Sequence, residues 1–390
     1  MSELLNGRWA ETKEALLEGL QGTKKSVMGV TLENTRKYLM ESPTAGATSA
    51  GNVATLNRVI LPVIRRVMPT VIANELVGVQ PMTGPVGQIH TLRVRYSDTS
   101  SGAGVVAGEE ALSPFKIAEA YSGNEASPAK AASTATLEGA AGKRMSIQIL
   151  KQTVEARTRK LSARWTFEAA QDAQAQQGID VEAEIMAALA QEITAEIDQE
   201  ILASLANLAG SAVQTYDQAA VSGTATFVGD EHAALAVQIN RVANLIAQRT
   251  RRGAGNWAVV SPFALTILQS ATTSAFARTT EGTFEAPTNT KFVGTLNNAM
   301  KVYVNSYAVD STDVLIGYKG GSESDAAAFY CPYIPLMSSG VVLDPSTFEP
   351  VVSFMTRYGY VELSNTASSL GNAADYLGKV AITAGNVKFS

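Results

Sequence analysis

Residues 180–208 have the sequence DVEAEIMAALAQEITAEIDQEILASLANL, which contains no Gly or Pro. A stretch of this kind can run as one helix of roughly 40 Å, at about 1.5 Å per residue. Its large apolar residues recur every fourth position, at Val181, Ile185, Leu189, Ile193, Ile197, Ile201 and Leu205. Because four residues overshoot a helical turn by about 40°, this row winds around the helix. We therefore expect a spine that several elements cross in turn, a scaffold rather than a pocket.

The same stretch carries charge of only one sign. Its acidic side chains are Asp180, Glu182, Glu184, Glu192, Glu196, Asp198 and Glu200. No Lys or Arg occurs between Arg164 and Arg241. A solvated face is the ordinary explanation, but cations from elsewhere can also meet such a face. Arg157, Arg159 and Lys160 lie in a basic run before the helix, and our hypothesis is that they supply positive charge from a different subunit.

The composition is that of a globular chain. Of its 390 residues, 46% are hydrophobic and 17% charged, which allows a sizeable core in about two or three domains. No apolar run is long enough to span a bilayer and the N-terminus lacks signal-peptide features, so we expect a cytosolic chain without membrane contact. Cys331 is the single cysteine, which excludes an intramolecular disulfide framework. The net charge of -5 and pI near 5.3 argue against a general nucleic-acid binder.

Residues 98–144 are rich in Ala, Gly and Ser, with Phe115 and Tyr121 nearly the only large apolar side chains. Such a segment has too little apolar surface to bury itself. Strand-like stretches flank it at 88–97 and 145–164, so we predict a long two-stranded excursion. We expect it to lie over a neighbouring subunit, with Phe115 or Tyr121 near its far end. A disordered insertion is the alternative.

The chain after the spine predicts a mixed α+β layer. The expected elements are a helix at 231–247, a strand at 257–262, a helix at 263–270 and strands at 301–307 and 313–319. Residues 340–363 predict two strands around a turn that return the chain towards its middle. Discontinuous domains follow from this return.

The sequence offers no catalytic, cofactor-binding or metal-binding pattern. His90 and His232 are the only histidines, and neither has metal-ligand spacing to a carboxylate. There is no GxxxxGK[ST] loop, GxSxG elbow or dinucleotide GxGxxG after a strand. The ladder of Glu192, Glu196 and Glu200 lacks the histidine of di-metal bundles. We therefore expect a protein that is not an enzyme.

Three separated motifs point to one family. They are GVQPMTGPVG at 78–87, RWTFEAAQDAQAQQGIDVEAEI at 164–185 and TRYGY at 356–360. Together they resemble the major capsid protein of contractile-tailed, T-even-like bacteriophages, in consistent order from about Leu56 to Leu363. The resemblance implies a late structural protein that assembles in the host cytoplasm and resides in the virion capsid. It also implies hexamers and pentamers of an icosahedral head that encloses double-stranded DNA, with a scaffold, a maturation protease, portal and decoration proteins as partners.

The resemblance implies an α+β, HK97-type capsid fold with an N-terminal arm, an extended β-hairpin loop, a peripheral domain with a long spine helix, and an axial domain. The corresponding segments are the arm at 1–51, the peripheral domain at 52–87, the extended loop at 88–164, spine helix and peripheral domain at 165–229, the axial domain at 230–339, and peripheral return strands with the C-terminus at 340–390. T-even members carry a folded insertion in the extended-loop region, and residues 98–144 are too short and apolar-poor for one.

The arm at 1–51 has too little apolar content for a core, so we expect it to cross onto adjacent subunits. The family's maturation protease cuts after the Glu of a [Leu/Ile]-x-Glu sequence that a small residue follows. Glu18 and Gly19, after Leu16 and Leu17, fit this pattern. Glu41 and Ser42, after Leu39 and Met40, nearly fit it.

Arg249, Arg251 and Arg252 close the second predicted helix before a Gly-rich turn. Complementing the negative end of that helix is the ordinary role of such residues. The alternative is an intersubunit contact in which Arg251 and Arg252 pair with Glu281 and Glu285 of a neighbour.

Other functions stay open at this point. A vertex paralogue that forms pentamers, or an encapsulin-type nanocompartment shell, would share the fold. A more distant alternative is an enzyme of unknown chemistry that uses the Asp and Glu ladder. Sedimentation separates these, since an enzyme runs as a small oligomer and a shell as a very large particle.

Overall fold

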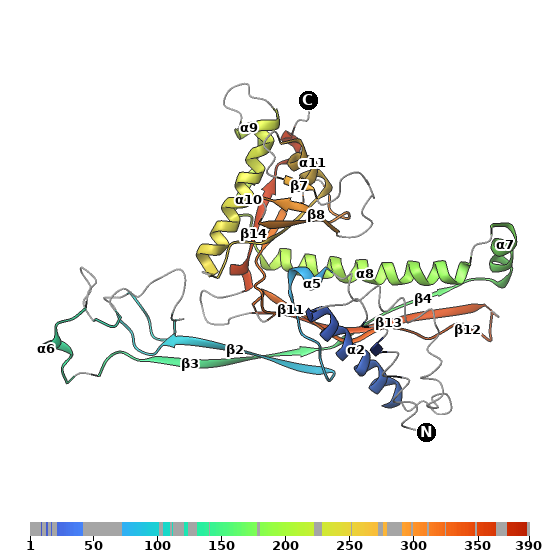
Figure 1. Ribbon diagram of the computed structural model, residues 1–390, viewed down its shortest axis with the longest axis horizontal. Coiled ribbons are helices and arrows are strands. Elements are labelled where there is room, and N and C mark those ends of the chain that lie inside the picture. The colour runs from blue at the N-terminus through green and yellow to red at the C-terminus, as the bar shows by residue number, and fades with distance from the viewer. Residues whose placement is uncertain are drawn as a thin grey trace. The chain divides into compact units, whose positions relative to one another are not determined.

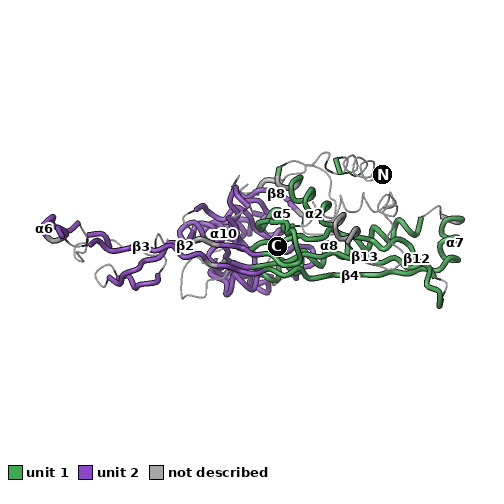
Figure 2. The backbone as a smooth tube through the Cα atoms, turned by 90° about the horizontal axis from the view of Figure 1, so that it is seen from below, with its two compact units in different colours: residues 1–87, 154–204, 328–361 green, residues 88–153, 205–327, 362–390 purple. Residues whose placement is uncertain are grey.

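The computed structural model describes Trp9, Lys13, Glu14, Leu17 and residues 22–41, 72–100, 104–109, 111, 121–123, 131–139, 141–177, 180–221, 228–250, 252–271, 276–278, 291–297, 299–309, 312–323, 325–347, 349–363 and 373–387. The chain divides into two compact units, both discontinuous in sequence (Figure 2). The first unit comprises residues 1–87, 154–204 and 328–361, and the second comprises residues 88–153, 205–327 and 362–390.

The first unit is built on a mixed sheet (Figure 1). Its strands are β1 (Gly78–Val79), β4 (Arg157–Arg164), β11 (Ala328–Ser338), β12 (Val342–Leu343) and β13 (Pro350–Glu362). β13 pairs with β11, β12 and β4, and β1 runs parallel to β11. From Val352 to Tyr358, buried residues of β13 alternate with half-buried ones, as expected for a strand with one covered face. The two strands predicted at 340–363 are confirmed as the antiparallel pair β12 and β13.

The helices of the first unit are α2 (Gly22–Glu41), α5 (Ala73–Leu76), α7 (Phe167–Gln177) and α8 (Val181–Leu208), the last four residues of α8 being grouped with the second unit. The long helix predicted at 180–208 is confirmed as α8. Asp180 Oδ1 accepts the N–H groups of Glu182 (3.1 Å) and Ala183 (3.4 Å), which satisfies two donors at the start of the helix. The predicted apolar row is buried from Leu189 to Leu205, whereas its first two members are only half-buried.

The stretch at 145–164 is not the single strand that we expected. β2 (Val86–Tyr96) pairs with β3 (Met145–Glu155) in a two-stranded sheet, and the chain then changes partner. The break lies at Ala156, whose N–H donates to Pro85 O at 2.9 Å instead of extending the strand. Residues 157–164 continue as β4, which pairs antiparallel with β13.

Residues 98–144 were expected to have too little apolar surface to bury themselves, and three of their side chains are nevertheless buried together with Tyr96. A small cluster forms from Tyr96, Val105, Ala111 and Tyr121, all of them buried. The rings of Tyr96 and Tyr121 lie 4.5 Å apart between centroids. Two aromatic rings and two small apolar residues thus suffice to fix this part of the excursion, which also carries the short helix α6 (Thr134–Leu137).

The second unit contains a larger sheet in the order β5-β14-β10-β6-β9-β8-β7. These strands are β5 (Gln214–Tyr216), β6 (Trp257–Val260), β7 (Phe276–Arg278), β8 (Lys291–Leu296), β9 (Met300–Val304), β10 (Val314–Gly317) and β14 (Leu377–Ile382). Its helices are α9 (Gln218–Val221), α10 (Val228–Thr250), α11 (Pro262–Ser270), η1 (Ala373–Tyr376) and η2 (Ala384–Asn386). Every element predicted between 231 and 319 is present. β14 was not predicted: residues 377–382 lie in the segment 340–390 expected to hold the return strands and the C-terminus, and they pair with β10.

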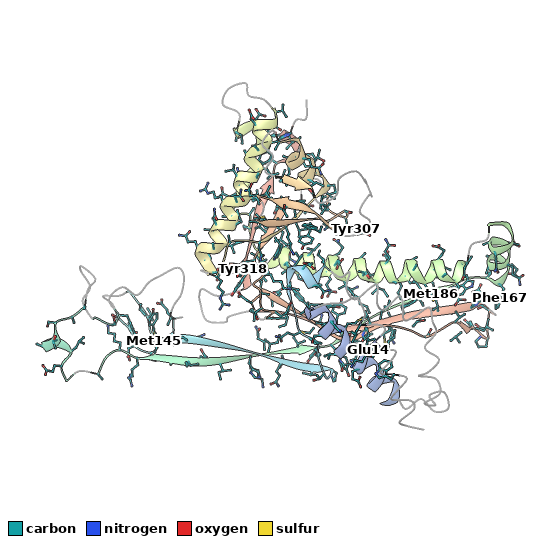
Figure 3. All side chains as sticks on the ribbon, viewed as in Figure 1. Glu14, Met145, Phe167, Met186, Tyr307 and Tyr318 are labelled. Carbon is teal, nitrogen blue, oxygen red and sulfur yellow. The ribbon has the colours of Figure 1, made fainter. Side chains whose placement is uncertain are left out.

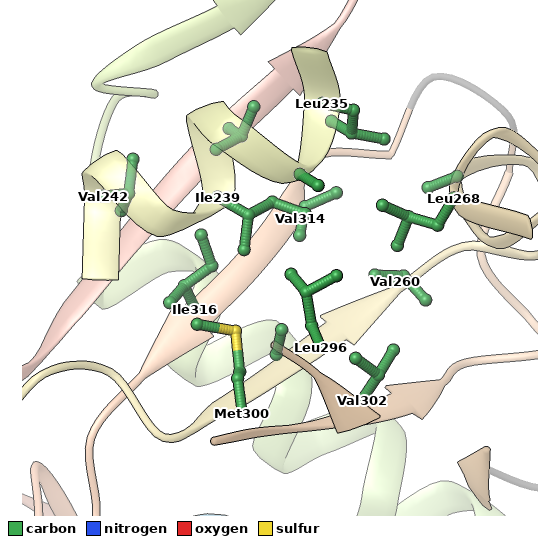
Figure 4. Packing of buried hydrophobic residues seen from close by; sticks show 14 of the residues in the cluster. Leu235, Ile239, Val242, Val260, Leu268, Leu296, Met300, Val302, Val314 and Ile316 are labelled. Carbon is green, nitrogen blue, oxygen red and sulfur yellow. The ribbon is translucent and has the colours of Figure 1, made fainter. Parts of the chain in front are cut away.

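The core of the second unit lies between α10 and this sheet (Figure 4). Leu235, Ile239 and Val242 on one face of α10 pack in the same cluster as Val314 and Ile316 of β10. This is the apolar face expected of a helix that covers a sheet. Both units mix helices and strands, which confirms the α+β class. No helix among the described residues is long and apolar enough to cross a membrane.

Candidate functional site

Arg159 joins three elements of the first unit. It lies on β4 opposite Thr356 of β13. Its Nη1 lies 2.6 Å from Glu196 Oε2 and its Nη2 lies 2.5 Å from Glu200 Oε2, both on α8. Its Nε donates to Tyr358 Oη on β13 at 2.6 Å. We call Arg159, Glu196, Glu200 and Tyr358 the arginine bridge.

The local structure explains why these groups meet. Glu196 and Glu200 are four residues apart on α8 and therefore share one face of the helix. The guanidinium presents several donors in a rigid plane, so that one side chain can serve both carboxylates and the phenol. Tyr358 in turn donates to Glu200, and its ring lies 5.4 Å from that of Tyr330 between centroids.

The bridge is held by charge. Burial opposes the charge of Arg159, but its hydrogen bonds to Glu200 and Tyr358 outweigh burial and raise its pKa. Burial also acts against the carboxylate of Glu200, yet bonds from Arg159 and Tyr358 lower its pKa. Both groups therefore stay ionised at neutral pH. The arrangement fixes a sheet to a helix and leaves no nucleophile or base free to act on a substrate.

Arg159 has partners within its own chain, and its predicted intersubunit role stays a prediction. A cation does meet the acidic face of α8, but it comes from the same chain, and its guanidinium is already engaged by Glu196 and Glu200. Arg157 and Lys160 are exposed on β4, and their intersubunit role stays a prediction.

Asp198, also on α8, has a quite different environment from its acidic neighbours. Its side chain is 1% exposed. Oδ1 accepts the N–H of Ile72 at 2.9 Å, and Oδ2 has no hydrogen-bond partner in the described part of the chain. Burial raises the pKa of Asp198 to about 7, against the opposing effect of the Ile72 hydrogen bond. The sequence placed Asp198 in the acidic line, and its only sequence signal for burial is that it follows Ile197 of the apolar row.

Arg252 also finds a partner within its own unit. Its Nη1 lies 2.6 Å from Asp325 Oδ1, and Tyr376 Oη donates to the same carboxylate at 3.4 Å. Burial opposes the charge of Arg252, while Tyr376 and Asp325 raise its pKa. Arg252 therefore has a carboxylate partner within its own unit, and its predicted pairing with a neighbour's carboxylate stays a prediction. Arg251, Glu281 and Glu285 lie outside the described residues.

Tyr121 is not an open aromatic contact. Its hydroxyl donates to Arg144 O at 2.6 Å and accepts the N–H of Asp98 at 3.3 Å. Lys143 Nζ lies 5.6 Å from the centre of its ring. The side chain therefore fixes the excursion internally, and its predicted contact with a neighbour stays a prediction. Phe115 lies outside the described residues.

The arm also finds burial on its own chain. α2 packs against β11, with Met28 and Leu32 almost fully buried. Glu41, one of the predicted cleavage positions, is the last residue of α2. Glu18, Gly19 and Ser42 lie outside the described residues.

The side chains that sequence analysis missed are apolar and exposed. Met145, Ile147 and Ile149 on β3 are 50%, 67% and 65% exposed. They are two residues apart and therefore lie on one face of the strand (Met145 is labelled in Figure 3). We call these three residues the β3 apolar row. The alternation in MSIQI was the available signal. Among the described residues, no cluster of three His, Cys, Asp or Glu side chains has an arrangement that holds a metal ion.

Comparison with known proteins agrees with the resemblance in the sequence. The family model for the major capsid protein Gp23 matches residues 53–141 and 127–382. The major capsid protein of Vibrio phage KVP40 is 30% identical over 85% of this chain and 81% of the relative. That of Enterobacteria phage T4 is 30% identical over 81% of this chain and 76% of the relative. A solved structure from Mycobacterium phage Bobi superposes with a TM-score of 0.47 at 13% identity, over 80% of this chain and 89% of that one.

The family model covers well over half of the chain, and relatives at this identity extend over most of it. The chain therefore belongs to the Gp23 major capsid protein family, and it is a structural, non-enzymatic subunit of the phage virion's capsid shell.

Proposed function

We propose that the chain assembles into hexamers and pentamers of an icosahedral head that encloses double-stranded DNA. The observation that carries this proposal is the β3 apolar row. It lies on a two-stranded sheet, a form that is at best marginally stable alone in water. Its three large apolar side chains are at least half exposed. A neighbouring subunit of the shell would cover them.

Each such contact is modest and the shell repeats it many times. Covering one large aliphatic side chain contributes about 1.5–3 kcal/mol at most. Weak repeated contacts let misplaced subunits leave before the shell closes, and closure then makes the assembly stable through multiplicity. The exposed charges of Arg157 and Lys160 on β4, and of Glu184 and Glu192 on α8, supply complementary surfaces between copies.

The remaining partners follow from the same role. A net charge of -5 fits a wall that surrounds DNA without gripping it. A scaffold, a maturation protease, a portal and decoration proteins are the partners that a head of this kind uses. We propose that the chain is divided into the arm, extended loop, peripheral and axial segments given above, with two changes. β4 belongs to the peripheral domain because it pairs with β13, and β14 belongs to the axial domain because it pairs with β10.

We also propose that the arm is cut during head maturation, after Glu18 or Glu41. Support for Glu41 comes from its place at the last residue of α2, where a protease meets the end of a helix instead of its middle. Mass spectrometry of subunits from purified heads tests this. An N-terminus at Gly19 or Ser42 is expected, and subunits that all retain Met1 would contradict it.

The test of the shell is to replace Ile147 with Asp and examine the purified protein by sedimentation and electron microscopy. We expect folded subunits that fail to form closed shells, because a charge on the apolar row cannot be covered without cost. The matched control is Gln148→Asp, which adds the same charge at an exposed position on the other face of β3. Normal shells from Ile147→Asp would contradict the proposal.

A further inference from the structure

The helix α2 is attached to the first unit through one face. Val27, Met28, Thr31, Leu32 and Asn34 are buried. Val27 and Thr31, Met28 and Leu32, and Thr31 and Asn34 are three or four residues apart, which places these residues on one side of the helix. Lys25 and Ser26, which precede them, are exposed. This face packs against β11 (Figure 1). The contact therefore has the form of an amphipathic helix seated on a strand.

Asn34 gives the contact polar specificity. Its Nδ2 donates to Met82 O at 2.5 Å and to Tyr333 O at 3.0 Å. These carbonyls belong to two neighbouring segments, since Met82 N–H donates to Pro332 O beside them. An Asn amide has two N–H donors, and both are used here. Without this amide, the two carbonyls would lose the donor that Asn34 supplies.

The outer side of α2 is touched by residues that precede it. Trp9 Nε1 donates to Glu33 at 3.3 Å, and Lys13 Nζ lies 3.3 Å from the same carboxylate. The two candidate cleavage positions therefore have different consequences. A cut after Glu18 leaves α2 covalently joined to the rest of the chain, whereas a cut after Glu41 leaves it attached by non-covalent contacts only.

We propose that the surface of β11 beneath α2 is a helix-binding site whose ligand is the chain's own segment 22–41, and that this segment stays bound after the Glu41–Ser42 bond is cut. The biological use of the site rests on the proposed cleavage after Glu41. Before the cut the ligand is tethered and its effective concentration is high. After the cut, the occupancy of the site depends on affinity alone. The main-chain carbonyls of Met82 and Tyr333 lose the Asn34 donor when the helix dissociates.

The experiment uses the full chain with a recognition sequence for an unrelated protease placed between Ser42 and Gly51. This experiment needs neither the phage protease nor shell formation. A negative result would therefore count against the helix-binding site, and not against the proposed cleavage or the proposed shell. After cutting, fragment 1–41 is expected to co-elute with the remainder in size-exclusion chromatography. A labelled peptide of residues 22–41 in excess is expected to exchange into the site.

The variant Asn34→Ala is expected to speed loss of the cut fragment about ten-fold, a ratio that corresponds to about 1.4 kcal/mol. The matched control Lys25→Ala alters an exposed residue of the same helix and should leave the rate unchanged. Thermal unfolding of each uncut variant checks that it is folded. Exchange of the labelled peptide into the cut wild-type protein tests the site without any substitution. The proposal is overturned if the wild-type fragment elutes apart at once, if excess peptide does not exchange, or if Asn34→Ala and Lys25→Ala release the fragment at the same rate.

Discussion

Arg159 Nη2 and Glu200 Oε2 lie 2.5 Å apart, although the two residues are 41 positions apart in the sequence. The contact ties β4 to α8, and Tyr358 of β13 binds both partners. This contact explains how α8, whose charged side chains are all acidic, stays packed against the sheet that contains β4 and β13. Like charges four residues apart on a helix repel each other, and one guanidinium between Glu196 and Glu200 reverses the sign of that interaction.

Arg159→Ala is expected to lower the free energy of unfolding of the unassembled subunit by about 1–2 kcal/mol, because two carboxylates and a phenol lose their shared donor while solvent compensates in part. Arg159→Lys should recover only part of this loss, since an ammonium cannot reproduce the planar set of donors. Chemical denaturation measures the change. Lys160→Ala, at an exposed neighbouring position, is the control, and an equal loss there would contradict the assignment.

The arginine bridge also predicts that the stability of the subunit depends on pH in the acid range. The pKa of Glu200 is lower in the folded chain than in the unfolded one, so its contribution is present above the ordinary carboxyl pKa of about 4.3 and is lost as the pH falls through the lowered value. The difference in stability between wild type and Glu200→Gln should therefore shrink as the solution is acidified below about pH 4. A difference that stays constant to low pH would show that the charge of Glu200 is unimportant.

Asp198 predicts the opposite dependence of subunit stability on pH, with stability lost as the pH rises. Its folded pKa of about 7 lies above the unfolded value, so the native state binds the extra proton and stability falls as pH rises towards 7. Asp198→Asn should stabilise the subunit by about 1–3 kcal/mol at pH 8, where the wild-type carboxylate is charged and buried, and much less at pH 5. Thermal unfolding at both pH values measures this. Glu192→Gln on the exposed face should show no such difference, and an equal effect of Asp198→Asn at both pH values would refute the prediction.

Gly359, within the TRYGY motif, has no room for a side chain. A Cβ there would lie 2.5 Å from Val154 Cγ1 and 3.2 Å from Glu155 O. Gly359→Ala is therefore expected to cost about 1–3 kcal/mol of subunit stability by overpacking. Gly142→Ala is the control, since a Cβ at that position meets nothing within 4 Å. Equal unfolding midpoints for the two variants would contradict this explanation of the motif.

Local patterns predicted most of the elements and few of the contacts between them. The spine followed from an unbroken run of helix formers, and α10 followed from its apolar face, because both signals lie within one segment. The break at Ala156 did not follow, since a change of strand partner depends on Pro85, far away in sequence. β14 was missed because LGKVAI is short and gains its burial only between β5 and β10.

The candidate contacts show the same limit. The sequence singled out Arg159, Arg252 and Tyr121 for contacts with a neighbouring subunit. Within the chain they contact Glu200, Asp325 and Tyr96. Charge and aromatic character are visible in a sequence. Which surface meets them is decided by the fold, and this is why the exposed β3 apolar row was recognised only in three dimensions.

The most direct test of the account is electron cryomicroscopy of the purified assembled protein. The account predicts closed icosahedral shells of hexamers and pentamers in which Met145, Ile147 and Ile149 of each copy lie against a neighbouring subunit. Small open oligomers, or closed shells in which this row still faces solvent, would contradict it.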